Sequence, residues 1–349
     1  MLTSAIAHAI LCIAACLWPV IGTPQPPPTL VNFNALDRIN IDIKNSKYGK
    51  ISSLLILQGN RIVYEKYYGF TQSTTLNPIS SVTKSITSLA VGICIDMGYI
   101  PSVDERIEEY FPEFQNLFQK DSSKRLITLR HLLNQTSGLQ WDEWSIHYSY
   151  AGNPLMELSQ SPINWFEQVL ELPMECAPGT KFNYNSGLSE VVKEIICRAT
   201  GKNFKDFVRD HIFNPLGIFN FYWDTYPLNG EPAWGGINLT TRDMARIGGL
   251  ILNRGVWANQ RVVSERWIEK SFQPSVETPK NSFGLNWWIK WLPHGMPIHF
   301  AAGYGDQYLY IIPDLKLVLA MNGRNFTDHK WEKNSDEIYK RVIEAFGQE

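Results

Sequence analysis

Two β-type segment pairs lie near opposite ends of this 349-residue chain, and this placement constrains the fold more than any other feature. Residues 52–67 predict a hairpin around Gly59-Asn60, a two-residue turn of the kind that accepts positive φ angles. Residues 307–321 predict a second pair around Pro313-Asp314, followed by a helical pattern from about 334 to 346. Together, these pairs favour one antiparallel sheet that contains both ends of the chain.

The intervening sequence is mostly helical. Amphipathic runs occupy residues 103–119, 162–170, 187–199, 203–213, 241–254 and 264–271. We therefore expect an α+β fold, in which an antiparallel sheet built from both chain ends is flanked by helices and carries an inserted, mostly helical region. The predicted domain spans residues 35–349, with sheet at about 50–70 and 283–349 and the helical region at about 85–282.

Composition narrows the class of partner. Hydrophobic residues make up 44% of the chain, which is enough for a large core, and the net charge is only -2. The chain has no basic run of the kind that neutralises phosphates, so it predicts no nucleic-acid binding. A small-molecule or short peptide-like substrate is the better expectation.

The N-terminal segment predicts export. Residues 4–22 are apolar apart from Ser4 and His8, and a Pro-rich linker follows at 23–34. Residues 1–22 are thus interpreted as a signal peptide or a membrane anchor, although no Lys or Arg precedes Arg38. The expected product is periplasmic, secreted or membrane-anchored, and lipid attachment through Cys16 is one alternative.

The cysteines and histidines do not predict a metal site or a cofactor, because none of them has the spacing of zinc ligands. Cys94 lies in an apolar run and is expected in the core. Cys176 and Cys197 could pair in an oxidising compartment or stay free, since a sequence does not give their distance.

One helical run is apolar or small almost all round. Residues 83–97 therefore predict a helix buried in the middle of the molecule. Ser81 lies just before this helix and Lys84 lies in its first turn. Because residues three apart share one helix face, the two side chains should be neighbours. A nearby amine and the positive end of a helix can both activate a serine. By itself, the spacing favours a serine that only caps the helix and a lysine that reaches solvent.

Two later segments favour a catalytic role for this serine–lysine pair. Residues 178–187 place Tyr184 at a turn just before a helix, and the glycine-rich residues 301–307 lead into a strand. The order of serine with lysine, then tyrosine, then a glycine-containing strand resembles the serine β-lactamases and penicillin-binding proteins. Residues 127–139, 235–246 and 283–288 resemble further segments of the class C β-lactamase-like hydrolases. The resemblance runs from about residue 50 to the C-terminus and is strongest to the branch of 6-aminohexanoate-oligomer hydrolases and esterases.

The resemblance implies a role for each matching residue. Ser81 would be the nucleophile that forms an acyl-enzyme, with Lys84 and Tyr184 as its acid and base, Tyr184 as a phenolate in one form of the mechanism. The backbone N–H groups of Ser81 and Tyr304 would hold the oxyanion. Gly303 would lie against the substrate.

Two departures from the β-lactamase pattern favour other substrates. Ser186 stands where a substrate-holding asparagine is usual, and Ala301 replaces a lysine that would attract a substrate carboxylate. The sequence therefore predicts a serine hydrolase of short esters or amides. A D-amino-acid peptidase or β-lactamase acting on cell-wall-type peptides is the alternative, and a catalytically silent envelope scaffold is another.

Aromatic residues follow the 127–139 segment. Trp141, Trp144, Tyr148 and Tyr150 surround the acidic pair Asp142-Glu143. One interpretation is a substrate wall, with Trp141 and Tyr148 in contact and the acids facing an amine. The other is a loop whose rings pack on the helical region. Three later tryptophans, at 287, 288 and 291, are expected in the core.

Other hydrolase and nucleotide-binding classes lack their motifs here. No G-x-S-x-G elbow, Walker loop or G-x-G-x-x-G fingerprint occurs in the chain. An α/β-hydrolase esterase and the common nucleotide-binding enzymes are therefore disfavoured.

Overall fold

The computed structural model describes residues 31–278, 280–292, 295–326 and 331–347. The expected leader at 1–22 and most of the Pro-rich linker lie outside the described residues. Within those residues, no helix is both long and apolar enough to cross a membrane. Helix α1 (Phe33–Lys44) begins inside the expected linker, two residues before the predicted domain start, because Asn32 caps it by accepting a hydrogen bond from the Ala35 N–H at 3.1 Å.

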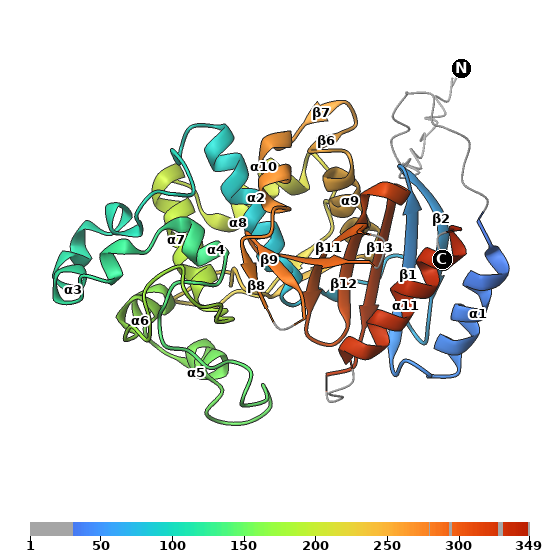
Figure 1. Cartoon of the computed structure of the whole chain (residues 1–349), viewed down its shortest axis with the longest axis horizontal. Coiled ribbons are helices and arrows are strands. Elements are labelled where there is room, and N and C mark those ends of the chain that lie inside the picture. Colours follow the sequence, from blue (N-terminus) through green and yellow to red (C-terminus); the bar gives the residue numbers. More distant parts are fainter. Residues whose placement is uncertain (1–30, 279, 293–294, 327–330, 348–349) are drawn as a thin grey trace, which may run out of the picture.

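The central sheet joins the two ends of the chain, as predicted. Its eight antiparallel strands are ordered β2-β1-β13-β12-β11-β10-β9-β8. Strand β1 lies between β2 from its own hairpin and β13 from the C-terminal part, with Leu55 opposite Ala320 (Figure 1). The strands are β1 (Ile51–Gln58), β2 (Arg61–Tyr67), β8 (Val276–Glu277), β9 (Ser282–Gly284), β10 (Trp287–Trp291), β11 (Pro297–Gly303), β12 (Gln307–Ile312) and β13 (Leu317–Gly323).

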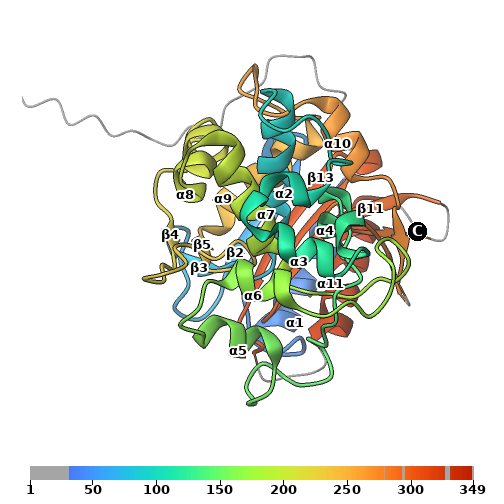
Figure 2. The ribbon, with the colours of Figure 1, turned by 90° about the vertical axis from the view of Figure 1, so that its left-hand side faces the viewer.

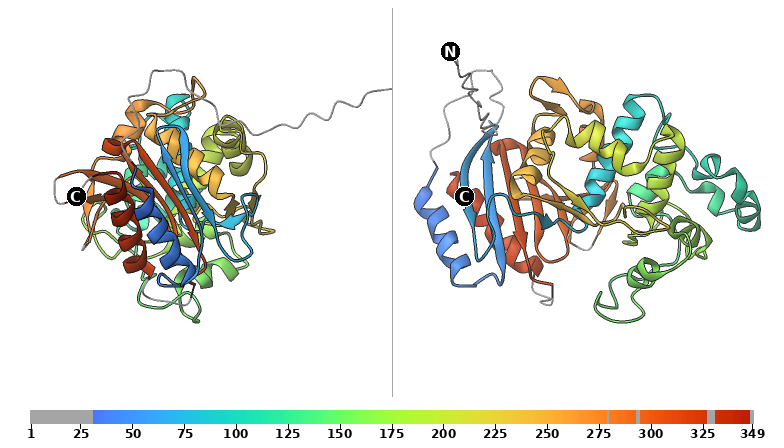
Figure 3. Two further views of the ribbon diagram at one scale, coloured as in Figure 1. Left: turned by 90° about the vertical axis from the view of Figure 1, so that its right-hand side faces the viewer. Right: turned by 180° about the vertical axis from the view of Figure 1, so that it is seen from behind.

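Helices cover both faces of this sheet. On one face α1 packs beside α11 (Trp331–Ala345), and Figure 3 shows the two helices running side by side. On the other face lie α9 (Thr241–Leu252) and α2 (Val82–Asp96). Alternate residues of β1 therefore enter different cores: Leu54 joins the α1–α11 side and Leu55 the α2–α9 side.

The inserted region lies beyond α2, away from α1 and α11 (Figure 1), and it faces the viewer in Figure 2. It contains α3 (Gln115–Lys120), α4 (Leu129–Leu133), α5 (Pro154–Gln160), α6 (Trp165–Glu171), α7 (Leu188–Thr200) and α8 (Phe204–Val208), while α10 (Glu265–Ser271) lies beside α2 on the sheet side. Two small sheets accompany the inserted region, formed by β3 (Asn77–Pro78), β5 (Ile237–Leu239) and β4 (Tyr222–Trp223), and by β6 (Val256–Trp257) and β7 (Gln260–Arg261). The predicted α+β class is confirmed.

Several side chains expected in the core differ in their placement. Cys94 is fully buried, as predicted, and Cys176 and Cys197 are both free thiols, so the pairing considered for them is not formed. The prediction of three core tryptophans was wrong for Trp291, whose surface is 53% exposed at the end of β10. Trp287 is buried as predicted, and Trp288 lines the cavity beside Ser81 that is described below.

Candidate active site

Ser81 stands at the N-terminal end of the buried helix α2. Thirteen of the fifteen residues of α2 are buried, so the helix is a rigid support inside the molecule. The preceding Ser80 has φ of 48°, a left-handed conformation that costs free energy in a residue other than glycine. This bend brings the chain sharply into the helix and leaves the Ser81 side chain at the helix N-terminus, where the helix dipole favours developing negative charge.

Lys84 contacts Ser81 directly. Its Nζ lies 2.9 Å from Ser81 Oγ and donates a second hydrogen bond, at 3.2 Å, to the carbonyl oxygen of Trp234. The side chain is only 2% exposed. Burial lowers the pKa of Lys84 to about 8, although the charges of Glu143 and Glu190 act in the opposite direction. A substantial fraction of this amine is therefore neutral near pH 8.

Tyr184 completes the group. Lys84 Nζ lies 5.0 Å from the centre of its ring, and its hydroxyl shares a hydrogen bond with Ser81. Burial and the nearby Glu143 raise the pKa of Tyr184 well above its ordinary value, and the Ser81 hydrogen bond offsets this only in part. The structure thus brings Ser81, Lys84 and Tyr184 together, and the raised pKa favours the neutral phenol of Tyr184 over the phenolate.

The end of β11 approaches Ser81 from the sheet side. Ser80 Oγ donates a hydrogen bond to the Tyr304 carbonyl oxygen at 3.0 Å. A Cβ atom at Gly303 would lie 2.4 Å from the Ile79 carbonyl oxygen, so only glycine allows this approach. The backbones at residues 80–81 and 303–304 are therefore held side by side, which is the arrangement that a two-amide oxyanion site requires.

Gly303→Ala is expected to destabilise the fold and to reduce hydrolysis. The new methyl group meets a backbone oxygen that cannot move without shifting the chain before Ser81, and overpacking of this kind costs about 1–3 kcal/mol. Denaturant unfolding measures the loss. Gly235→Ala is the matched control, since its nearest neighbour would be 3.8 Å away. Equal stability of the two variants would contradict the close approach.

Aromatic rings line one side of the site. The Tyr184 ring stacks on Trp144 at 5.1 Å and on Trp288 at 6.2 Å between ring centres. Phe283 meets Trp288 edge-on at 4.7 Å and Phe182 at 5.3 Å. These five rings give the site an apolar wall, drawn from the loop after α4, the turn before α7, and strands β9 and β10.

Three residues expected to contact substrate form hydrogen bonds with Glu143 in this structure. Ser186 is fully buried and donates its Oγ–H to Glu143 Oε1 at 2.6 Å. Tyr148 donates its hydroxyl to the same oxygen at 2.8 Å, and Trp141 donates its Nε1–H to Oε2 at 2.9 Å. In this structure the three polar groups are therefore committed to a buried carboxylate, which also leaves Glu143 itself unavailable to the substrate amine considered from the sequence.

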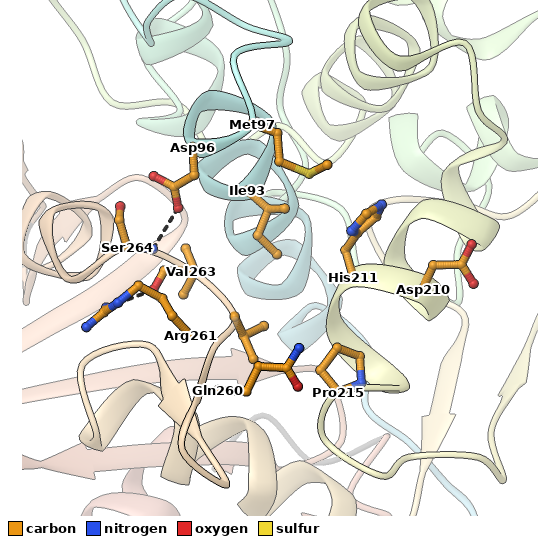
Figure 4. A pocket seen from close by; sticks show the side chains of 11 residues that line it. Ile93, Asp96, Met97, Asp210, His211, Pro215, Gln260, Arg261, Val263 and Ser264 are labelled. Atoms are coloured by element: carbon orange, nitrogen blue, oxygen red, sulfur yellow. Dashed lines mark hydrogen bonds between the residues drawn. The ribbon is translucent and has the colours of Figure 1, made fainter.

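The cavity beside Ser81 is narrow. About 10 Å³ is open there, scarcely the room of one water molecule. It is lined by Ser81, Lys84, Ser85, Tyr184, Phe283, Asn286, Trp288 and Ala302. A larger cavity of about 450 Å³ lies at the opposite end of α2, beside Asp96 and His211, and contains none of these residues (Figure 4).

Sequence reasoning missed several residues that shape the site. Asn286 and Phe283 enter from the β9–β10 turn, and Gln135 links that turn to the Tyr184 segment by donating to Asn286 Oδ1 at 3.2 Å and accepting from the Asn185 N–H at 2.7 Å. Glu190 acts on Lys84 from α7 and forms an ion pair with Lys193. Gln135 lies in the 127–139 segment, but neither its contacts nor its positive φ of 60° can be inferred from its residue type.

The fold and the buried serine–lysine pair define a known class, and residues 52–336 match the family model described as Beta-lactamase. The chain belongs to this family. It is similar to the 6-aminohexanoate-dimer hydrolase of Paenarthrobacter ureafaciens, with 24% identity over 68% of this chain and 63% of that protein. The lovastatin esterase of Penicillium rubens is 26% identical over 52% of this chain and 48% of its own length. The chain thus spans less than two thirds of the length of each of these two relatives.

Solved structures share the fold. A hydrolase with promiscuous acyltransferase activity superposes with a TM-score of 0.72 at 15% identity, covering 90% of this chain and 99% of the other.

Proposed function

We propose that this enzyme hydrolyses short esters, and more slowly amides, of apolar acids through an acyl-enzyme on Ser81. The observation that carries the proposal is the 2.9 Å contact between Lys84 Nζ and Ser81 Oγ inside a buried site. A lysine that loses its proton near pH 8 can act as a general base at physiological pH.

In the first half-reaction, neutral Lys84 accepts the Ser81 hydroxyl proton as Oγ attacks the carbonyl carbon. The carbonyl π electrons move to oxygen, and the backbone N–H groups of Ser81 and Tyr304 stabilise that oxyanion. When the intermediate collapses, the bond to the leaving group breaks. Tyr184, a neutral phenol, gives its proton to the departing alcohol or amine and is reprotonated from Lys84.

The second half-reaction uses water. A water molecule attacks the acyl carbon while neutral Lys84 accepts its proton, and the ester bond to Ser81 breaks as Lys84 returns that proton to Oγ. The acid leaves, so the enzyme returns to its initial state.

The apolar wall supports the choice of substrate. Aromatic rings line one side of the site, with Tyr184, Phe283 and Trp288 in the cavity wall, and they favour an uncharged acyl group. Ala301, buried at the position of the family's carboxylate-attracting lysine, supplies no cation for a penicillin-like acid. The matched lovastatin esterase is, by its name, an ester hydrolase, which agrees with this preference.

A substrate panel tests the proposal. We expect clear turnover of p-nitrophenyl butyrate, with nitrocefin and a D-Ala-D-Ala peptide hydrolysed at least tenfold less efficiently, since loss of one charged contact is worth roughly 1.5–3 kcal/mol. Faster turnover of nitrocefin than of the ester would contradict it and favour the β-lactamase alternative. Absence of any turnover or labelling by a fluorophosphonate would favour the silent scaffold.

A further inference from the structure

Glu143 is a buried carboxylate that the reaction described above does not use. Its side chain is 2% exposed. Four donors converge on it: the Trp141 indole N–H, the Tyr148 hydroxyl, and both the backbone N–H and the hydroxyl of Ser186, the last two at 2.7 Å and 2.6 Å. A carboxylate is an acceptor only, so this set of four donors matches its chemistry.

These contacts join two segments that are far apart in the sequence. Trp141 and Tyr148 belong to the covering loop, defined here as residues 141–153, whereas Ser186 lies two residues after Tyr184. The backbone of the same loop is fixed by Asn153, whose side-chain amide donates to the carbonyl oxygens of Glu143 and Ile146. Glu143 therefore holds the covering loop against the segment that carries Tyr184.

The same loop reaches the site from its other side. Trp144, next to Glu143, stacks on the Tyr184 ring, and the Tyr148 ring lies 5.0 Å from that of Tyr304. The Tyr304 hydroxyl and His147 Nε2 are 3.0 Å apart. A displacement of Glu143 would thus be transmitted both to the phenol and to the end of β11.

The charge of Glu143 also acts on the catalytic pair. It raises the pKa of Lys84 and that of Tyr184. The other ionisable groups facing Lys84 are Glu190 on α7, itself paired with Lys193, and Tyr184. Those acting on Tyr148 are Glu143, Tyr184 and Tyr304.

We propose that Glu143 is a positioning residue, which fixes the covering loop and the Tyr184 segment over Ser81 and places one negative charge beside Lys84 and Tyr184. The inference rests on the proposed function, because it assigns Glu143 to the reaction of Ser81. If Glu143 had only a structural role, it would fix the loop but its charge would not affect Lys84 or Tyr184.

The pH dependence of two rates in Glu143→Gln separates these cases. One is kcat/KM for p-nitrophenyl butyrate, and the other is the rate of Ser81 labelling by a fluorophosphonate, which needs no turnover. In the parent enzyme both should rise with pH as Lys84 loses its proton, with a midpoint near its pKa of about 8. Without the Glu143 charge the amine loses its proton more readily, so the midpoint should move to lower pH by about one unit. The plateau should fall about tenfold as the loop loosens.

Two further variants serve as controls. Asp142→Asn removes the same charge from the adjacent exposed residue and should leave both profiles unchanged. Tyr148→Phe keeps the Glu143 charge and removes one hydrogen bond, so the plateau should fall severalfold with the midpoint in place. Thermal unfolding shows that each variant is folded.

The outcomes distinguish the inference from the proposed function. An unmoved midpoint in folded Glu143→Gln would overturn the inference while leaving Ser81 chemistry intact. If Glu143→Gln does not fold, Tyr148→Phe and Ser186→Ala still test the positioning role. An unchanged plateau of both pH–rate profiles in these two variants would overturn it. Absence of both hydrolysis and labelling in the parent enzyme would reject the proposed function itself, and the inference with it.

Discussion

Ser81→Ala should lower kcat/KM for p-nitrophenyl butyrate by about 10⁴-fold or more, because the variant has no oxygen to form the acyl-enzyme. The remaining rate would come from binding and from the oxyanion-stabilising amides, which the substitution leaves in place. Since the lost group is one hydroxyl at the start of a helix whose other residues are unchanged, the fold should be retained. Initial rates measured beside the thermal unfolding midpoint separate loss of chemistry from loss of structure.

The matched control for this variant is Ser88→Ala. Ser88 is a buried serine on the same helix, and its hydroxyl has no hydrogen-bond partner among the described residues. Its removal should leave the rate of hydrolysis unchanged. Activity retained in Ser81→Ala, or lost equally in both variants, would show that hydrolysis does not depend on the Ser81 hydroxyl.

Lys84→Met should lower kcat/KM by about 10³-fold, the scale on which a positioned general base contributes. Methionine fills nearly the same buried space, but it cannot accept the Ser81 proton or donate to the Trp234 carbonyl oxygen. The rise of activity with pH near 8 should vanish together with the amine that causes it. A pH–rate profile of the folded variant measures both effects.

Lys124→Met controls for the removal of a buried lysine. Lys124 is 4% exposed, donates to the Leu170 carbonyl oxygen at 2.6 Å and also has a pKa lowered by burial, yet it lies outside the site. This variant should lose stability without losing activity per folded molecule. A Lys84→Met enzyme with an unchanged pH profile would contradict the assignment of Lys84 as the base.

The sheet could be predicted from the sequence because its signals are local. Alternating and apolar runs around Gly59-Asn60 and around Pro313-Asp314 mark the strands of β1–β2 and β12–β13 wherever they pair. The apolar run at 83–97 likewise required burial, and α2 is buried. Helix α1 was not predicted, although its buried residues Leu36, Ile39 and Ile43 recur at helical spacing.

The site could be predicted only in part, because its proximity arises from tertiary packing. Ser81 and Lys84 share a helix turn, so their contact follows from spacing, whereas the approach of Tyr184 required the family resemblance. Ser186 was predicted to contact substrate from its position in the family motif, and Tyr148 from its place in the aromatic segment after residues 127–139. Their actual partner, Glu143, lies 43 residues from Ser186, and no local pattern encodes that contact.

Peptide mapping of the enzyme after reaction with a fluorophosphonate tests the central claim most directly. The account predicts a single phosphonyl adduct on the Ser81 hydroxyl, absent in Ser81→Ala and formed much more slowly in Lys84→Met. An adduct on another residue, or undiminished ester hydrolysis by enzyme whose Ser81 is fully labelled, would contradict it.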